Sequence, residues 1–393
     1  YQPVAVRDAA RDFAIRMNVH NAYSLAGCEW LLQRGGIQRA TPAASAAAGD
    51  WIDSVFTMRS LDAVLRQMRP VGQAVGIDGF VGATVRWAPR ELQREYLRLL
   101  KATVRACVDE GDVPTTWPEW LVKMIPKKGR DASLFSNLRD IWMVVHSWKI
   151  VTGMFAAWYN RVADRVMPWL NAGFRSGMAV ADVAVVASFH SAQVHTTGAP
   201  LARTYVDRRG FFMGVPRPVS FHLESYYGVE AGITDTIRAV HGVATGRVDT
   251  AYGLTEPFPC TTGTGQGCKL GAVRSMLPLI VTQTALQSMV PGFRFEVPHG
   301  ATAWLVSSLF FADDNNMPAS DMQGLQLGLD VEDVSSLVSG NVVAVDAKGR
   351  ATKTACMYMV MAHDGRVTCA VDVRLTDGTV VATASRGDAS SSM

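Results

Sequence analysis

The sequence has few cysteines, and none of them is arranged to hold a structural metal or a disulfide framework. Its 393 residues include six Cys and eight His, with no Cys-x-x-Cys pair and no Cys/His cluster at zinc-ligand spacing. It also lacks an apolar run of the roughly 18–20 residues that span a bilayer, and it opens without a basic-then-apolar leader. We therefore expect a soluble intracellular protein in a reducing compartment that does not bind a membrane.

Charge of either sign is also scarce. Charged residues make up 19% of the chain and apolar residues 48%, which indicates a globular protein and excludes a disordered one. The 38 basic and 35 acidic residues leave a net charge of +3, which is compatible with an anionic partner without demanding one. The length suffices for two or three structural units. Because the first residue is Tyr1 and not Met, we expect a fragment of a longer product.

Hydrophobic patterning predicts a mixed α/β chain. Helices are expected from residue 60, from Pro89, and over 142–170, 180–195, 220–231 and the residues after Gly271. Strands are expected over 121–125, 201–206, 301–311, 341–345 and 355–360, with a hairpin of 368–375 and 379–383 around Asp377-Gly378. The helix that opens at Pro89 is predicted to bury one apolar stripe, formed by Leu92, Tyr96, Leu99, Leu100, Val104 and Cys107.

Three aspartates directly follow apolar segments. Asp207 comes after Thr204-Tyr205-Val206, and Asp313 and Asp314 come after Leu309-Phe310-Phe311-Ala312. If the two segments are neighbouring strands, three carboxylates meet at one edge of a sheet, and their repulsion calls for divalent cations such as Mg²⁺. Two metal ions about 3.5–4 Å apart can activate a 3′-hydroxyl and stabilise a leaving pyrophosphate. A single Asp at such a place more often caps a turn, but that role does not account for two adjacent acids after Phe-Phe-Ala.

Two further segments suggest a phosphate-bearing partner. Residues 120–149 contain six basic and two acidic residues, a balance of +4 that could hold a triphosphate or a nucleic-acid backbone. A solvated charged face explains the same residues equally well. Residues 261–267 read Thr-Thr-Gly-Thr-Gly-Gln-Gly, a turn that lets the backbone approach a substrate closely, although such turns occur in many loops.

Eight short elements follow one another between about residues 60 and 360. They lie at 76–80, 113–117 with 124–129, 137–141 with 148–150 and 160–162, 172–177, 206–212, 265–270, 311–314 and 340–354. Their residues and their order along the chain resemble the motifs of reverse transcriptases, most like those of non-LTR retrotransposons. In that family Phe-Ala-Asp-Asp is the motif that carries two of the catalytic aspartates.

The resemblance implies an RNA-directed DNA polymerase with a right-hand fold, that is, an α/β (α+β) chain with helical fingers and an antiparallel-sheet palm. The implied ligands of two Mg²⁺ ions, with Mn²⁺ as the substitute, are Asp207, Asp313, Asp314 and the backbone carbonyl of Arg208. The implied partners are an RNA template, a DNA or RNA primer and a dNTP. The implied location is the nucleus, which follows only from what such elements do.

The resemblance also assigns the residues that contact the nucleotide. Lys127 and Arg139 would reach the triphosphate, and Gln266 and Gly267 would line the nucleotide and template pocket. Lys353 would be a general acid toward pyrophosphate, and a solvated lysine is an equal alternative for it.

Phe212 stands five residues after Asp207, where the family places an aromatic residue under the sugar. A ring there would clash with a ribose 2′-hydroxyl and favour deoxynucleotides. A plain core phenylalanine is the alternative.

The implied domains are an N-terminal extension (1–59), fingers with part of the palm (60–200), the palm (201–384) and a disordered tail (385–393). We expect the thumb and the endonuclease of the family to be absent. Departures from the family pattern suggest a diverged copy: Asp140 for Pro, Met213 for Asp, Gly271-Ala272 for Ser-Pro, and Pro278 inside a helix. A catalytically inactive relic that only binds nucleic acid therefore stays an alternative, and an RNA-dependent RNA polymerase is disfavoured by Phe212.

Overall fold

The computed structural model describes residues 8–9, 11–12, 23–40, 50–68, 75–208, 210–265, 267–295, 303–341, 343–344, 355–359, 373–375 and 380–383. The chain forms two compact units. The first consists of Tyr1–His20, Arg39–Arg165 and Phe212–Ser275, and the second consists of Asn21–Gln38, Val166–Phe211 and Met276–Met393. The predicted domain boundaries at residues 59, 200 and 384 stay a prediction.

Helices make up most of the first unit. They are α3 (Asp50–Val55), α4 (Met58–Gln67), α5 (Ala83–Trp87), α6 (Arg90–Asp109), α7 (His146–Val166, whose last residue lies in the second unit), α9 (Arg217–Tyr227) and α10 (Ala231–Gly242). Local sequence sets several helix ends: Thr57 and Ser60 form a reciprocal capping box at the start of α4, and α9 ends at Gly228 in the left-handed conformation. The helix predicted from residue 60 is thereby confirmed.

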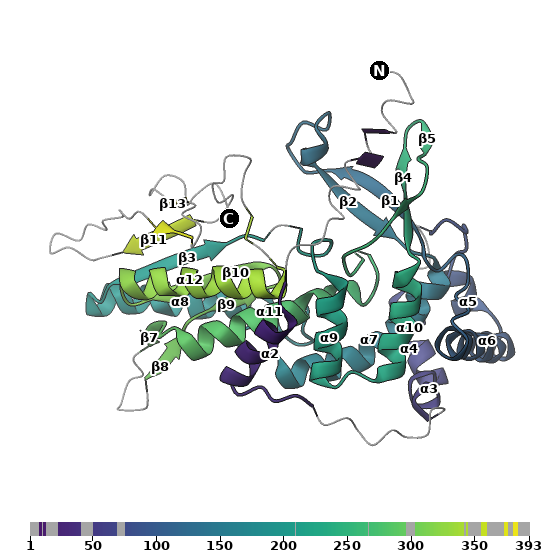
Figure 1. Ribbon diagram of the computed structural model, residues 1–393, viewed down its shortest axis with the longest axis horizontal. Helices are drawn as coiled ribbons and strands as arrows, with labels where there is room; N and C mark the ends of the chain where they lie inside the picture. The colour runs from purple at the N-terminus through teal and green to yellow at the C-terminus, as the bar shows by residue number, and fades with distance from the viewer. Residues whose placement is uncertain are drawn as a thin grey trace. The chain divides into compact units, whose positions relative to one another are not determined.

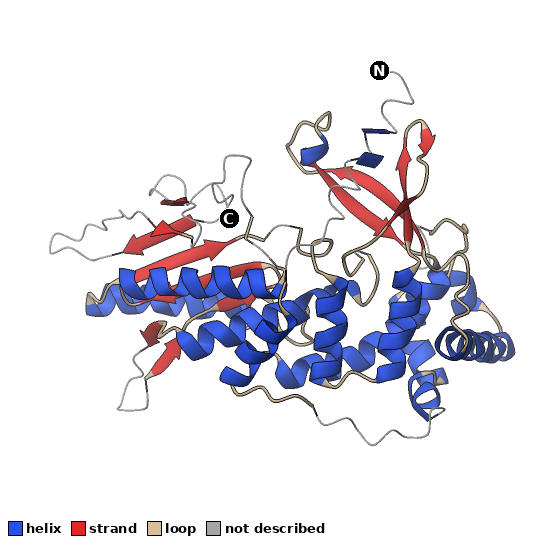
Figure 2. Ribbon diagram, in the orientation of Figure 1, coloured by secondary structure: helices blue, strands red, loops and turns tan. Residues whose placement is uncertain are grey.

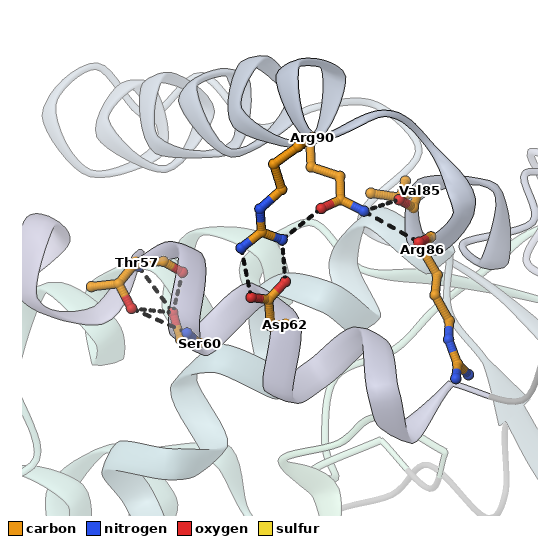
Figure 3. A network of polar contacts seen from close by, with 7 residues as sticks. Thr57, Ser60, Asp62, Val85, Arg86 and Arg90 are labelled. Atoms are coloured by element: carbon orange, nitrogen blue, oxygen red, sulfur yellow. Dashed lines mark hydrogen bonds and ion pairs between the residues drawn. The ribbon is translucent and has the colours of Figure 1, made fainter.

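A polar network ties α4, α5 and α6 together (Figure 3). The guanidinium of Arg90 donates to both carboxylate oxygens of Asp62 at 2.6 and 2.7 Å and to Oε1 of Gln93 at 2.8 Å. The amide of Gln93 donates to the backbone oxygens of Val85 and Arg86 at 3.1 and 3.2 Å. Gln93 thus satisfies carbonyls at the end of α5, which explains why a polar side chain is buried on α6.

The apolar stripe predicted for α6 is wrong at two positions. Leu92 and Leu99 are exposed, at 59% and 61% of their surface. The buried residues of this helix are Gln93, Leu97, Leu100, Val104 and Cys107. Their spacing of four and three residues is helical as well, so the buried face is rotated relative to the predicted one.

The first unit also contains a small sheet (Figure 2). Its strands are β1 (Glu119–Pro126), β2 (Leu138–Met143), β4 (Thr245–Thr250), β5 (Gly253–Leu254) and β6 (Phe258–Pro259), in the order β2-β1-β4-β5 with β6 also paired to β4. The helix predicted over 142–170 is therefore wrong at its start, because residues 142–143 belong to β2. Trp142 packs edge-to-face against Trp120 and Phe258, with ring centroids 5.8 and 6.1 Å apart.

The second unit is built on a mostly antiparallel sheet. Its described strands are β3 (Leu201–Val206), β9 (Leu309–Phe311), β10 (Asp314–Ala319), β11 (Ala355–Met359), β12 (Val373–Arg374) and β13 (Val380–Thr383), in the order β12-β13-β11-β3-β10-β9. Only the β11–β13 pair is parallel among these strands. The strand predicted over 301–311 is two strands, because β8 (Trp304–Val306) pairs with β7 (Phe293–Phe295) and not with the sheet that contains β9.

Helices cover this sheet. α12 (Met322–Ser339) packs on β3 and β10, α8 (Val180–Thr197) packs on β3 and β9, and α2 (Leu25–Arg34) packs on α12 (Figure 1). α11 (Gly271–Met289) contains Pro278, and the boundary between the two units falls within this helix. Among the helices that the structure describes, none combines the length and the apolar character of a membrane span. The fold is a mixed α/β arrangement of helices and several sheets.

Candidate active site

The antiparallel pairing of β3 and β10 brings the three predicted aspartates to one edge of the second unit's sheet. Val206, the last residue of β3, is opposite Asn315. Asp207 directly follows Val206 and Asp314 directly precedes Asn315, so the register brings both aspartates to the same end of the β3–β10 pair. Asp313 precedes Asp314 in the turn that joins β9 to β10. The prediction that the carboxylates meet closely enough to share metal ions stays a prediction, because Asp207 lies one residue beyond the last paired position of β3.

The turn that carries Asp313 is held in a sterically demanding conformation. Ala312 has φ 55°, in the left-handed region that side chains other than glycine seldom adopt. Residues 170–172 run alongside β9, since the Ala172 N–H donates to the Phe310 oxygen and the Phe310 N–H donates to the Leu170 oxygen, both at 3.0 Å. A Cβ on Gly173 would lie 2.2 Å from the nitrogen of Ala312, so only glycine fits beneath the turn.

Side-chain alternation places Asp207 and Asp314 on the sheet face opposite α12. Val206 and Asn315 are buried on the face that α12 covers, so their neighbours in sequence point to the other face. Tyr205, on that other face, is 40% exposed. Asp314 is exposed, and Asp207 and Asp313 are half-buried. The carboxylates therefore lie at a solvent-accessible end of the sheet.

Arg208, predicted to contribute its backbone carbonyl, has a fully buried side chain. Its guanidinium forms an ion pair with Glu332 of α12, donates to the Ser336 hydroxyl at 2.8 Å and donates to the Asn341 oxygen at 2.9 Å. Nδ2 of Asn315 donates to the second oxygen of Glu332 at 2.9 Å. This network was not predicted, and its one local signal in the sequence is a glutamate on the apolar side of α12.

Residues 343–344 extend the sheet beside Asp207. Val343 forms an isolated antiparallel bridge with Arg208, and the Ala344 N–H donates to the Asp207 oxygen at 3.0 Å. The strand predicted over 341–345 is, in its described residues, a single isolated bridge and not a strand. Lys353 and Gln266 lie outside the described residues, so their predicted roles stay predictions.

The basic residues predicted to hold the triphosphate lie on the β1–β2 hairpin of the first unit. Arg139 is exposed and opposite Ile125 in the register. The backbone N–H of Lys127 donates to the Asn137 oxygen at 2.8 Å, which closes the hairpin. By alternation along β1, Lys123 and Lys127 share the face of Arg139. Lys123 pairs with Asp249 at 3.2 Å with both partners partly exposed, a contact that adds little stability.

Asp140 occupies the opposite face of β2. Its carboxylate accepts a hydrogen bond of 2.6 Å from Nε1 of Trp142. Burial raises the pKa of the Asp140 carboxyl above its usual value, while the Trp142 hydrogen bond acts in the other direction. Asp140 is therefore a half-buried acid of the hairpin, and the charge of Lys127 also acts to lower its pKa.

The glycine-rich turn packs on the segment that follows the first aspartate motif. The Gly263 N–H donates to the Val215 oxygen and the Thr264 N–H donates to the Phe212 oxygen, both at 2.9 Å. Gly267 has φ 111°, and a Cβ there would lie 2.2 Å from the Trp142 oxygen. The turn thus fills the space between residues 212–215 and β2, and Phe212 is half-buried beside it.

The predicted site residues fall into two sets. Asp207, Arg208, Asp313 and Asp314 belong to the second unit, whereas Lys127, Arg139, Phe212 and Gly267 belong to the first. Among the described residues, no group of three or more His, Cys, Asp or Glu side chains is arranged to hold a metal ion. The donor type of the three aspartates nevertheless fits Mg²⁺, which takes carboxylate oxygens and keeps coordination positions for phosphate and water.

No model of a known protein family matches this chain. Function is therefore inferred from the residues of the site and their geometry.

Proposed function

We propose that the chain is the core of a reverse transcriptase of a retrotransposon-like element, an RNA-directed DNA polymerase with a right-hand fold. In this proposal the mostly antiparallel sheet of the second unit is the palm. The observation that supports the proposal is the register of β3 and β10, which pairs Val206 with Asn315, the residues next to Asp207 and Asp314. The sequence elements that surround these aspartates support it.

Asp207 and Asp313 would hold two Mg²⁺ ions, with Asp314 beside them and the backbone oxygen of Arg208 as a further ligand. When bound, the ions supply charge neutralisation at the primer 3′-hydroxyl and at the α-phosphate of the dNTP. The protein contributes by placing these oxygens in advance at a sheet edge, so that little reorganisation is needed during nucleotidyl transfer.

Residues of the first unit would bind the dNTP. Lys127 and Arg139 lie on one face of the β1–β2 hairpin, where two cations can pair with phosphate oxygens. Phe212 would exclude a ribose 2′-hydroxyl and so favour deoxynucleotides. The proposed partners are an RNA template and a DNA or RNA primer.

Primer extension on an RNA template with dNTPs and Mg²⁺ tests the proposal. We expect extension by the wild-type chain and a loss of about 100-fold or more in Asp207→Asn and Asp313→Asn, because each substitution removes a metal ligand. Asp330→Asn, an α12 carboxylate that accepts from Gln326 at 2.8 Å, is the matched control and should retain activity. Extension that is unchanged in both site variants would overturn the proposal.

The second candidate is a chain that binds nucleic acid without catalysis. It is favoured by the exposed basic hairpin and by the lack, among the described side chains, of a group of three metal ligands. Salt-dependent RNA binding together with no extension by the wild-type chain would support it. Incorporation of rNTPs at least equal to that of dNTPs would instead indicate an RNA-dependent RNA polymerase.

A further inference from the structure

A fully buried ion pair lies directly behind the candidate aspartates. The side chains of Arg208 and Glu332 are both 0% exposed, and Glu332 also accepts the hydrogen bond from Asn315. Burying two charges costs several kcal/mol per ion before their attraction offsets it, so such a pair contributes little to stability relative to apolar residues of equal volume. In some proteins a buried polar network of this kind instead fixes one conformation.

The network joins the two strand ends that carry the aspartates. Arg208 directly follows Asp207, and Asn315 directly follows Asp314. Both side chains reach the same carboxylate, one oxygen of Glu332 for each. Glu332 lies on α12, which packs on the sheet face opposite Asp207 and Asp314. One helix residue therefore fixes both strands from behind, at the positions next to the aspartates.

A third strand end is held by the same group. The Arg208 guanidinium lies 5.8 Å from the centre of the Phe310 ring in β9, the strand that leads into the turn with Asp313. It also donates to the Asn341 oxygen, next to the segment that hydrogen-bonds the backbone of Asp207. The buried pair thus contacts residues next to Asp207 and Asp314 and one residue of β9.

We propose that Glu332 is a positioning residue that sets the separation of Asp207 from Asp313 and Asp314, and through it the affinity of these carboxylates for a divalent cation. The inference rests on the proposed function, since it takes the aspartates as metal ligands. Glu332 touches neither metal nor substrate in this account. It acts through Arg208 and Asn315 on the backbone positions of the ligands.

The first unit contains a matched control. Nε of Arg274 pairs with Oε1 of Glu224 at 2.6 Å, and these side chains are 1% and 0% exposed. This arginine–glutamate pair is as deeply buried as that of Arg208 and Glu332, but no candidate metal ligand is a sequence neighbour of either residue. Loss of Glu224 therefore reports the general cost of leaving a buried arginine unpaired.

The experiment is a titration of the full chain with MnCl₂, followed by the electron paramagnetic resonance signal of free Mn²⁺. The variants are Glu332→Gln, Glu224→Gln, Asn315→Ala and Asp207→Asn, each checked for folding by circular dichroism and thermal melting. We expect both glutamine variants to melt earlier than the wild type. Of the two glutamine variants, only Glu332→Gln should weaken Mn²⁺ binding, by about 10-fold or more. Asn315→Ala should weaken it less, and Glu224→Gln should stay within about twofold of wild type.

Two results separate the inference from the function on which it rests. Loss of Mn²⁺ binding in Asp207→Asn, with wild-type affinity in Glu332→Gln, would overturn the positioning role and leave the proposed function standing. Wild-type Mn²⁺ binding in Asp207→Asn would overturn the proposed function itself. If Glu332→Gln does not fold, Asn315→Ala decides, because it keeps the ion pair and removes one connection: unchanged Mn²⁺ affinity in that variant overturns the inference. If Glu224→Gln and Glu332→Gln weaken Mn²⁺ binding equally, the positioning role of Glu332 is overturned as well.

Discussion

Substitution of Gly173 by alanine should destabilise the turn that carries Asp313. The new Cβ would lie 2.2 Å from the nitrogen and 2.7 Å from the Cα of Ala312, both backbone atoms that no rotamer change can move away. Forcing a methyl group into such a site costs about 1–3 kcal/mol. Alanine also reduces the conformational entropy of the unfolded chain, which stabilises the folded state by about 0.4–1 kcal/mol. The midpoints of these two ranges give a net loss of about 1.3 kcal/mol.

Urea unfolding gives the size of this loss, and hydrogen exchange of residues 309–319 locates it. The matched control in the same unit is Gly328→Ala in α12, where the nearest atom to a new Cβ is Cγ1 of Val290 at 3.7 Å. That variant should gain up to about 1 kcal/mol, since alanine is the better helix former. A Gly173→Ala protein as stable as the wild type, with unchanged exchange in the turn, would refute the packing described here.

The other predictions concern pH, a surface ion pair and sugar selection. Burial lowers the pKa of His190 to about 4 from 6.5. As the pH falls from 6.5 to 4 the unfolded state binds the proton first, so the free energy of unfolding drops by up to about 3 kcal/mol. Urea midpoints across this range should depend less on pH in His190→Phe than in the wild type, and an equal dependence would contradict this prediction. Asp62→Ala removes the partly exposed pair with Arg90 and should cost about 0.5–1 kcal/mol in urea unfolding; a loss above about 2 kcal/mol would mean that the contact is stronger than a surface pair. Phe212→Ala should raise rNTP incorporation relative to dNTP in primer extension, and an unchanged ratio would count against the sugar gate.

Elements with strong local signals could be predicted from the sequence. The strand over 201–206 is β3 with the same bounds, and the helix expected over 180–195 is α8. The pairing expected for the C-terminal hairpin is confirmed where described, since Val373 is opposite Val381. In each case a short apolar or alternating run is bounded by turn residues, so neighbouring positions alone define the element.

Elements that depend on distant partners could not be predicted in this way. The run Trp142-Met143-Val144-Val145 is apolar and has no period that separates a buried strand from a helix. It becomes a strand through residue 143 because Leu121 lies opposite Met143 in β1. On α6 the choice between two helical stripes depends on where Gln93 finds the carbonyls of α5, which the helix sequence does not contain.

In the candidate site, too, residues with a local sequence signal could be predicted and residues that depend on a distant partner could not. Asp207, Asp313 and Asp314 could be proposed from sequence because acids directly after buried strands are unusual. The ion pair of Arg208 with Glu332 spans more than a hundred positions and depends on how α12 lies on the sheet. No local pattern around either residue marks its partner.

Anomalous diffraction from a crystal of the chain soaked in MnCl₂ tests the central claim most directly. The account predicts Mn²⁺ peaks between the carboxylates of Asp207 and Asp313, at the edge where β3 meets β10. Two such ions would lie about 3.5–4 Å apart. Carboxylates separated by much more than about 8 Å, beyond the reach of a metal pair, with Mn²⁺ bound elsewhere or not at all, would contradict it.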